Sequence, residues 1–232
     1  MSNLPDHKTA TSAVDAFLDA ARKTPAVAAA GRGRLIFALD ATMSRQPTWD
    51  MAQGLQQQMF ALAARHGGID VQLVYFRGLS ECRASRFVSQ GEGLAALMSK
   101  IDCRGGYTQI EKVLRHAADE TRTAPVAALI YVGDALEENP DTLAAIAGEL
   151  ALRGLKAFMF HEGNDAKAGA CFRDIARITG GAYAAFDAGA PQRLAALLGA
   201  VAAYAAGGHQ ALTDRAREGD AAARLLLEQM GK

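Results

Sequence analysis

Residues 34–44 read RLIFALDATMS, an apolar run that ends in an aspartate and two hydroxyl side chains. Similar runs follow along the chain, VQLVYF at 71–76, VAALIYV at 126–132, KAFMF at 156–160 and AYAAF at 182–186. Because each run is apolar at nearly every position, both faces of the strand that it forms are predicted to be buried. This pattern is typical of a parallel sheet that helices cover on both sides.

The segments between these runs carry helical patterns. Two apolar stripes at helical spacing are Leu55, Met59, Leu62 and Ile110, Val113, Leu114, Ala117. Alternation of strand and helix predicts a doubly wound, Rossmann-like α/β fold with a mostly parallel sheet of six strands. The polar segment 77–93 breaks the alternation, and it predicts a hairpin whose short antiparallel edge strand covers about 86–89.

Three segments are predicted along the chain. Residues 1–30 are Ala-rich with apolar side chains at helical spacing, which indicates an N-terminal helical segment. Residues 31–206 form the main domain. Gly207 and Gly208 then break the pattern, and residues 207–232 form a C-terminal helical tail that docks on the domain or on a partner.

Composition excludes several classes of protein. The 25 basic and 25 acidic side chains cancel, so the chain lacks the positive field with which nucleic-acid-binding proteins attract phosphates. The three cysteines contain no CxxC pair, which favours a reducing compartment over a disulfide framework. No stretch of about 20 apolar residues occurs, so we expect a cytoplasmic protein without a membrane partner.

Side chains with oxygen atoms gather where the predicted strands end. Asp40, Thr42 and Ser44 follow the first strand, and Asp134 follows the fourth. With strand order 3-2-1-4-5-6, the first and fourth strands are neighbours and both carboxylates reach one edge of the sheet. Thr108 adds a third hydroxyl at the start of a predicted helix. Oxygen atoms are the ligands that Mg²⁺ and Mn²⁺ prefer, so these residues predict a site for such an ion.

This arrangement resembles the von Willebrand factor A (VWA) domain family, in its bacterial intracellular type, over residues 34–205. Asp-x-Thr-x-Ser after the first strand, Thr in a Gly-Gly loop and Gly-Asp after the fourth strand resemble the family's metal-ion-dependent adhesion site (MIDAS). The resemblance implies metal ligands at Asp40, Thr42, Ser44, Thr108 and Asp134. It also implies a surrounding partner-binding rim, which would comprise Met43, Arg45, Gly106, Tyr107, Glu137 and Glu138.

The resemblance implies that the protein is a non-catalytic module that binds another protein. A Mg²⁺ or Mn²⁺ ion would leave one coordination position for an Asp or Glu carboxylate of a protein partner. Intracellular bacterial members of the family often act with AAA+ ATPases or in stress-response systems, so partners of these kinds are implied.

Other readings of the same residues stay open. Thr108 with Glu111 three positions later matches a capping box, which needs no metal. His161 beside Glu162 could serve as a general base. A Mg²⁺-dependent phosphoryl hydrolase or transferase also places an aspartate after the first strand, and a scaffold that has lost the metal could act through its terminal helices.

Overall fold

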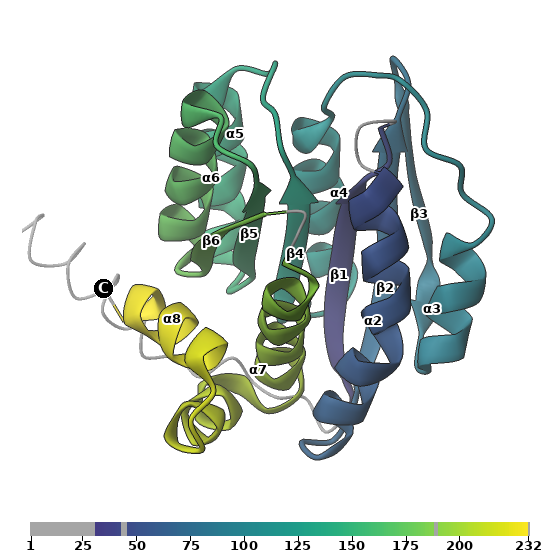
Figure 1. Ribbon diagram of the computed structural model, residues 1–232. Coiled ribbons are helices and arrows are strands. Elements are labelled where there is room, and N and C mark those ends of the chain that lie inside the picture. Colours follow the sequence, from purple (N-terminus) through teal and green to yellow (C-terminus); the bar gives the residue numbers. More distant parts are fainter. Residues whose placement is uncertain (1–30, 43–45, 188–189, 232) are drawn as a thin grey trace, which may run out of the picture.

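The chain folds around one six-stranded sheet in the computed structural model, which describes residues 31–42, 46–187 and 190–231 (Figure 1). The strands are β1 (Gly33–Asp40), β2 (Ile69–Arg77), β3 (Glu81–Val88), β4 (Ala128–Gly133), β5 (Lys156–Glu162) and β6 (Ala182–Phe186). Their order in the sheet is β3-β2-β1-β4-β5-β6, and only the β2–β3 pair among them is antiparallel. The predicted fold class is therefore confirmed.

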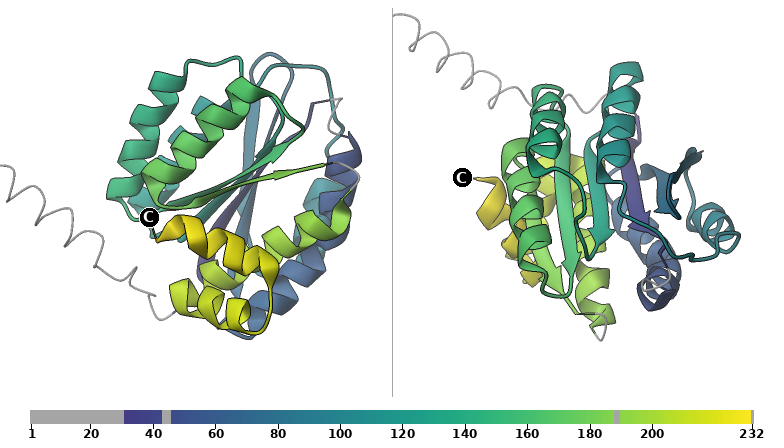
Figure 2. Two further views of the ribbon diagram at one scale, coloured as in Figure 1. Left: turned by 60° about the vertical axis from the view of Figure 1, so that its left-hand side comes forward. Right: turned by 90° about the horizontal axis from the view of Figure 1, so that it is seen from above.

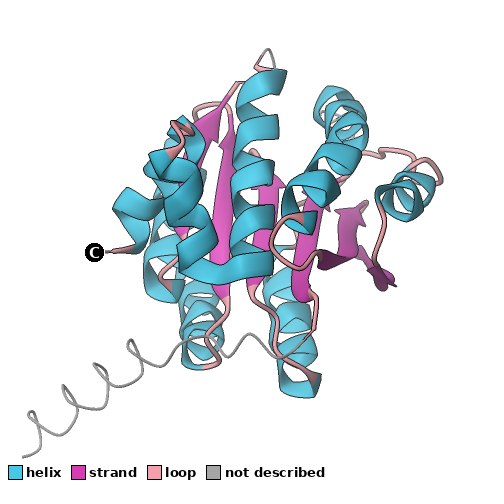
Figure 3. Ribbon diagram, turned by 90° about the horizontal axis from the view of Figure 1, so that it is seen from below, coloured by secondary structure: helices cyan, strands magenta, loops and turns pink. Residues whose placement is uncertain are grey.

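Helices cover both faces of this sheet, and Figure 3 shows the strands between the two helical layers. The described helices are α2 (Gln46–Ala64), α3 (Gly91–Met98), α4 (Ile110–Thr123), α5 (Pro140–Leu152), α6 (Ala166–Thr179), α7 (Pro191–Arg217) and α8 (Ala221–Met230). Each face of the sheet has a hydrophobic core, and side chains of β1 contribute to both. Leu35 and Phe37 pack against α2 and α7, whereas Ile36 and Ala38 face α4 to α6. All four side chains are buried, as their consecutive apolar positions predict.

The antiparallel edge strand is longer than its sequence predicts. It begins at Glu81 rather than near Arg86, and it ends at Val88. Exposed residues such as Arg83 make it polar, which hides the strand from a search for apolar runs. Its pairing with β2 is also irregular, because the Ser85 hydroxyl accepts a hydrogen bond from the Leu73 N–H at 3.0 Å where the register shifts.

The segment after residue 206 packs on the domain. Helix α7 kinks at Gly208, which has φ 67°, and continues to Arg217. Helix α8 then lies beside α7 and β6 (Figure 2, yellow), with the Leu226 side chain buried in the same core as α2 and α7. The Gln229 amide exchanges two 2.9 Å hydrogen bonds with the Tyr183 backbone, so it occupies the open edge of β6. The predicted N-terminal helical segment lies outside the described residues.

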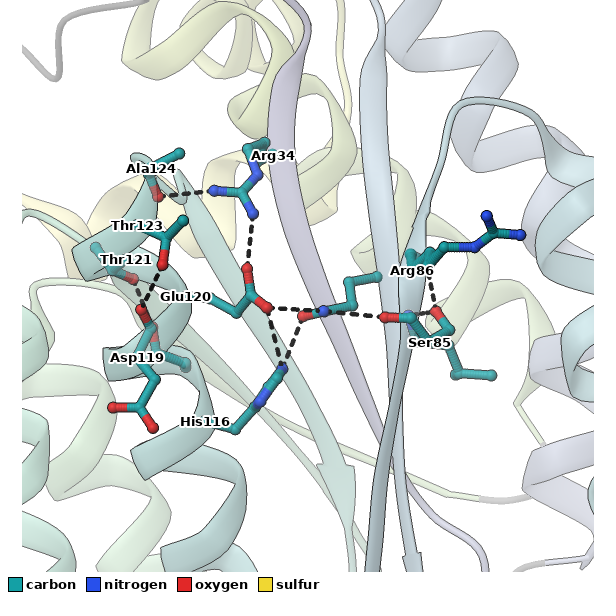
Figure 4. A network of polar contacts seen from close by, with 12 residues as sticks. Arg34, Ser85, Arg86, His116, Asp119, Glu120, Thr121, Thr123 and Ala124 are labelled. Atoms are coloured by element: carbon teal, nitrogen blue, oxygen red, sulfur yellow. Dashed lines mark hydrogen bonds and ion pairs between the residues drawn. The ribbon is translucent and has the colours of Figure 1, made fainter.

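A polar network holds the sheet to α4 towards the amino ends of the parallel strands (Figure 4). Arg34 donates to Glu120 at 2.7 Å, and the other Glu120 oxygen accepts from the Gln72 amide at 3.1 Å. The same Gln72 nitrogen donates to the Ser85 carbonyl at 3.0 Å, while the Gln72 oxygen lies 2.9 Å from His116 Nε2. This network ties β1, β2, β3 and α4 together.

Candidate functional site

The opposite end of the sheet brings the predicted metal ligands into one region. Asp40 is the last residue of β1 and is only 2% exposed. Its Oδ1 atom accepts the Thr42 backbone N–H at 2.7 Å, a local turn that short polar side chains favour. Because β1 and β4 are parallel neighbours with Leu39 paired to Val132, Asp134 leaves the sheet beside Asp40.

Thr108 reaches this region from the loop before α4. Its hydroxyl donates to Glu137 Oε2 at 2.5 Å, and its backbone N–H donates to the same oxygen at 2.9 Å. In return, the Glu137 N–H donates to the Thr108 hydroxyl oxygen at 3.3 Å. The hydroxyl proton is therefore directed at Glu137, and one lone pair of the oxygen is left over for another ligand.

Helix α4 is capped from a neighbouring loop, and the capping box interpretation of Thr108 and Glu111 is wrong. The N-cap residue is Gln109, whose side chain makes no capping bond. Instead, the Glu138 carboxylate accepts the N–H groups of Ile110 at 2.6 Å and of Glu111 at 2.8 Å. A carboxylate here satisfies two amides that the helix leaves unpaired and complements the positive end of its dipole.

Backbone contacts fix the loops around these ligands. The Arg104 N–H donates to the Ala41 carbonyl at 2.9 Å, and the Tyr107 N–H donates to the Gly78 carbonyl at 3.1 Å. The structure thus places these candidate ligands and candidate rim residues at the carboxyl end of the sheet: Asp40, Thr42, Thr108, Asp134, Gly106, Tyr107, Glu137 and Glu138. The predicted ligand Ser44 and the predicted rim residues Met43 and Arg45 lie outside the described residues.

Burial and nearby carboxylates raise the pKa values of two side chains at this end. The Tyr131 hydroxyl is buried without a hydrogen-bond partner in the structure. Burial raises the pKa of Tyr131 well above its ordinary value, and the carboxylates of Asp40, Glu138 and Asp134 raise it further. Burial, followed by the charge of Asp40, also raises the pKa of the Cys103 thiol to about 11. The same carboxylates attract a cation.

A further carboxylate lies at this end of the sheet, and the sequence analysis did not include it among the predicted metal ligands. Glu162 ends β5 and is 6% exposed, and the Thr48 hydroxyl at the start of α2 donates to it. The signal was present, since Glu162 follows a buried strand as Asp40 does. Its neighbour His161 lies between the Asp134 carbonyl at 3.3 Å and the Tyr183 hydroxyl at 3.0 Å, and it is 2% exposed. Through these contacts His161 connects β5 to Tyr183 on β6 and to the loop after β4.

The donor set suits a hard divalent ion. The described candidates present only carboxylate and hydroxyl oxygens, which Mg²⁺ and Mn²⁺ prefer. Within the described ranges, no three His, Cys, Asp or Glu side chains form a metal-binding group. A site here therefore depends on hydroxyl oxygens as well as on the two carboxylates of Asp40 and Asp134.

No protein-family model and no curated protein matches this chain. Solved structures do match it. Human COPII-coat protein Sec24c has a TM-score of 0.58 at 14% identity over 74% of this chain, which spans only 32% of that protein. The SpRpn10 VWA domain has a TM-score of 0.54 at 10% identity, covering 70% of this chain and 95% of that domain.

A third similar structure is that of proximal thread matrix protein 1 from the mussel byssus, solved with a zinc-occupied MIDAS motif. It has a TM-score of 0.55 at 15% identity. The match covers 71% of this chain and 44% of that protein. The fold is that of a VWA domain. None of these three neighbours is named as an enzyme, and in the described part of this VWA fold no helix has the length and apolar character to cross a membrane.

Proposed function

We propose that this VWA fold is a cytoplasmic interaction module that binds a protein partner through a divalent ion. Asp40, Thr42, Ser44, Thr108 and Asp134 hold Mg²⁺ or Mn²⁺ in this proposal. When bound, the ion supplies an electrophilic position that a carboxylate of the partner completes. The partner presents an Asp or Glu side chain, as a component of an AAA+ ATPase or stress-response system would.

The Thr108–Glu137 pair is the observation that carries this proposal. A hydroxyl whose proton is held at 2.5 Å by Glu137 turns a lone pair away from that carboxylate. Groups that orient a metal ligand in this way contribute to affinity although they do not touch the ion. The carboxylates of Asp40, Glu138 and Asp134, which together with burial raise the pKa of Tyr131, add an attraction for a cation at the same end of the sheet.

The phosphoryl-transfer alternative finds less support. Phosphoryl transfer uses a protein cation held against the phosphate as well as the metal ion. Arg104 precedes Thr108 in the same loop, but it is exposed and makes no ion pair with any residue that the structure describes. The lysine that the sequence offers on these strands, Lys156, begins β5 and pairs with Ala128 at the amino end of the sheet.

Calorimetric titration of Mg²⁺ and Mn²⁺ into chelator-stripped protein tests the proposal. We expect one binding site in the wild type, and its loss in Asp40→Asn and Thr108→Val, which preserve side-chain size. Thr123→Val is the matched control, because Thr123 ends α4 at the amino end of the sheet.

Thermal unfolding of the same samples gives a second readout. Binding to the native state alone stabilises it by about 2.7 kcal/mol when the ion is at 100 times its Kd. A wild type that shows neither heat nor stabilisation at millimolar ion would exclude the metal site. Partner binding that survives excess chelator would point to the metal-free scaffold.

A further inference from the structure

Two large apolar side chains stand exposed beside the candidate metal site. Leu79 is 80% exposed in the β2–β3 turn, and Tyr107 is 59% exposed in the loop before α4. Figure 1 shows both loops at the top of the view, at the carboxyl end of the sheet. The third large exposed apolar side chain among the described residues, Leu152, ends α5 and lies away from them.

The two loops are in direct backbone contact. The Tyr107 N–H donates to the Gly78 carbonyl at 3.1 Å. Gly106 lies so close to the same turn that a Cβ atom there would be 2.3 Å from the Gly78 nitrogen. Leu79 and Tyr107, each next to one of these glycines, therefore belong to two loops that touch, and we call this pair of exposed side chains the Leu79–Tyr107 patch. Single exposed apolar residues need no explanation, whereas larger exposed apolar areas mark interaction sites.

The turn that carries Leu79 is fixed by hydrogen bonds on both sides. The Gln109 amide donates to the carbonyls of Arg77 and Glu81, both at 3.2 Å. The Lys112 ammonium donates to the Ser80 carbonyl at 2.8 Å. Since these bonds already order the turn, a partner that contacts Leu79 loses little additional conformational entropy of the loop.

The patch adjoins the proposed metal ligands and a cation. Tyr107 immediately precedes Thr108, whose hydroxyl faces Glu137. Arg104 lies in the same loop, is exposed, and makes no ion pair with any residue that the structure describes. A ligand on this surface can therefore contact an apolar side chain, a positive side chain and the candidate metal ligands.

We propose that the Leu79–Tyr107 patch selects partners in which a large apolar side chain lies close to the metal-binding carboxylate. The expectation that the partner carries a metal-binding carboxylate rests on the proposed function above. In an extended peptide, residues two apart lie on one side about 7 Å from each other. A peptide with an acidic residue and, two or three positions away, a leucine or an aromatic residue therefore has the chemistry that this surface would recognise. Arg104 favours further acidic residues in the same segment.

Selection from a phage-displayed library of random heptapeptides tests this specificity. The full chain is the bait, in millimolar Mg²⁺ and separately in chelator. We expect the wild type with Mg²⁺ to enrich peptides that contain an acidic residue and a large apolar residue within three positions. Leu79→Ser and Tyr107→Ser should keep the acidic preference and lose the apolar one. Leu152→Ser, at an exposed leucine elsewhere, should select as the wild type does.

A selected peptide is then titrated into each variant. We expect its Kd to rise roughly tenfold in Leu79→Ser and in Tyr107→Ser, and to stay unchanged in Leu152→Ser. Two results would overturn the role of the patch and leave the proposed function standing. In the first, Mg²⁺ enriches acidic peptides that show no preference for a large apolar residue. In the second, that apolar preference exists but Leu79→Ser and Tyr107→Ser both retain it. Enrichment of apolar peptides in chelator, lost in Leu79→Ser, would support the patch and overturn the metal-dependent function. No enrichment in either condition would overturn both.

Discussion

The two ends of the sheet use polar side chains in opposite ways. At the amino end, Arg34 neutralises Glu120, and the Gln72 amide connects that carboxylate to β3 and His116. At the carboxyl end, carboxylates bond backbone amides and a hydroxyl, and the Tyr131 hydroxyl is left without a partner in the structure. The difference teaches that the amino end pairs its carboxylate with a cation, whereas the carboxyl end uses the carboxylates of Glu137 and Glu138 to hold Thr108 and the start of α4 beside the other candidate metal ligands.

Replacing Arg34 is expected to give the largest effect. Arg34→Met keeps most of the side chain's apolar contacts but leaves Glu120, which is 24% exposed, without its cation. Losing one partner of a largely buried pair should lower the free energy of unfolding by about 2 to 3 kcal/mol in urea. Arg115→Met breaks the exposed pair with Glu111 and should cost under about 1 kcal/mol. Equal losses in the two variants would contradict a structural role for the network.

Removing the carboxylate that caps α4 should have an intermediate effect. Glu138→Ala leaves the N–H groups of Ile110 and Glu111 without their acceptors, and we expect a loss of about 1 to 2 kcal/mol in unfolding free energy. Glu138→Gln keeps one acceptor oxygen and should recover part of it. Glu149→Ala, on α5, is the control. A stable Glu138→Ala variant would mean that solvent caps the helix equally well.

Deleting the Tyr131 hydroxyl should stabilise the metal-free protein. Tyr131→Phe removes a buried polar group that has no hydrogen-bond partner among the described residues, and it should raise the unfolding free energy by about 1 kcal/mol. Tyr183→Phe removes a hydroxyl that lies 3.0 Å from His161 Nδ1, and it should destabilise by a similar amount. We therefore expect changes of opposite sign in the unfolding free energies of Tyr131→Phe and Tyr183→Phe, measured in urea. Destabilisation by both changes would mean that the Tyr131 hydroxyl is already satisfied.

The smallest expected effect is a pH dependence at the amino end. Burial lowers the pKa of His116 below its ordinary value of 6.5, although the nearby Glu120 opposes this. The unfolded chain therefore binds a proton more readily than the folded one, and stability falls as the pH drops below about 6.5. His116→Gln should flatten this part of a stability curve measured from pH 8 to 5. His209→Gln, at an exposed histidine, should leave the curve unchanged.

Most of the fold could be predicted because the parallel strands are buried on both faces. The run from Leu35 to Leu39 is apolar at every position, and both cores use it. Strand β3 begins earlier than predicted because none of its residues is fully buried, and Arg83 and Arg86 interrupt the apolar pattern. The polar edge of the sheet thus carries less sequence signal than its centre.

The candidate site was predictable only in part. Asp40, Thr42, Thr108 and Asp134 follow strands or precede a helix, and the parallel topology alone carries such positions to one end. The bonds from Glu137 and Glu138 to the start of α4 join two loops almost 30 residues apart. No local spacing encodes such a contact. The local pattern of Thr108 and Glu111 instead suggested a capping box that does not form.

The central position of β1 has a consequence for synthesis on the ribosome. Leu35 pairs with Ala128, so one edge of β1 waits for a strand that lies roughly ninety residues later in the chain. At about 5 to 20 residues per second, that interval is roughly 5 to 20 s. During it, a strand with five consecutive apolar residues, Leu35 to Leu39, exposes unpaired amides and carbonyls, which is the condition under which chaperones bind and chains aggregate. The strand that organises the finished sheet is thus also a vulnerable segment while the chain is being made.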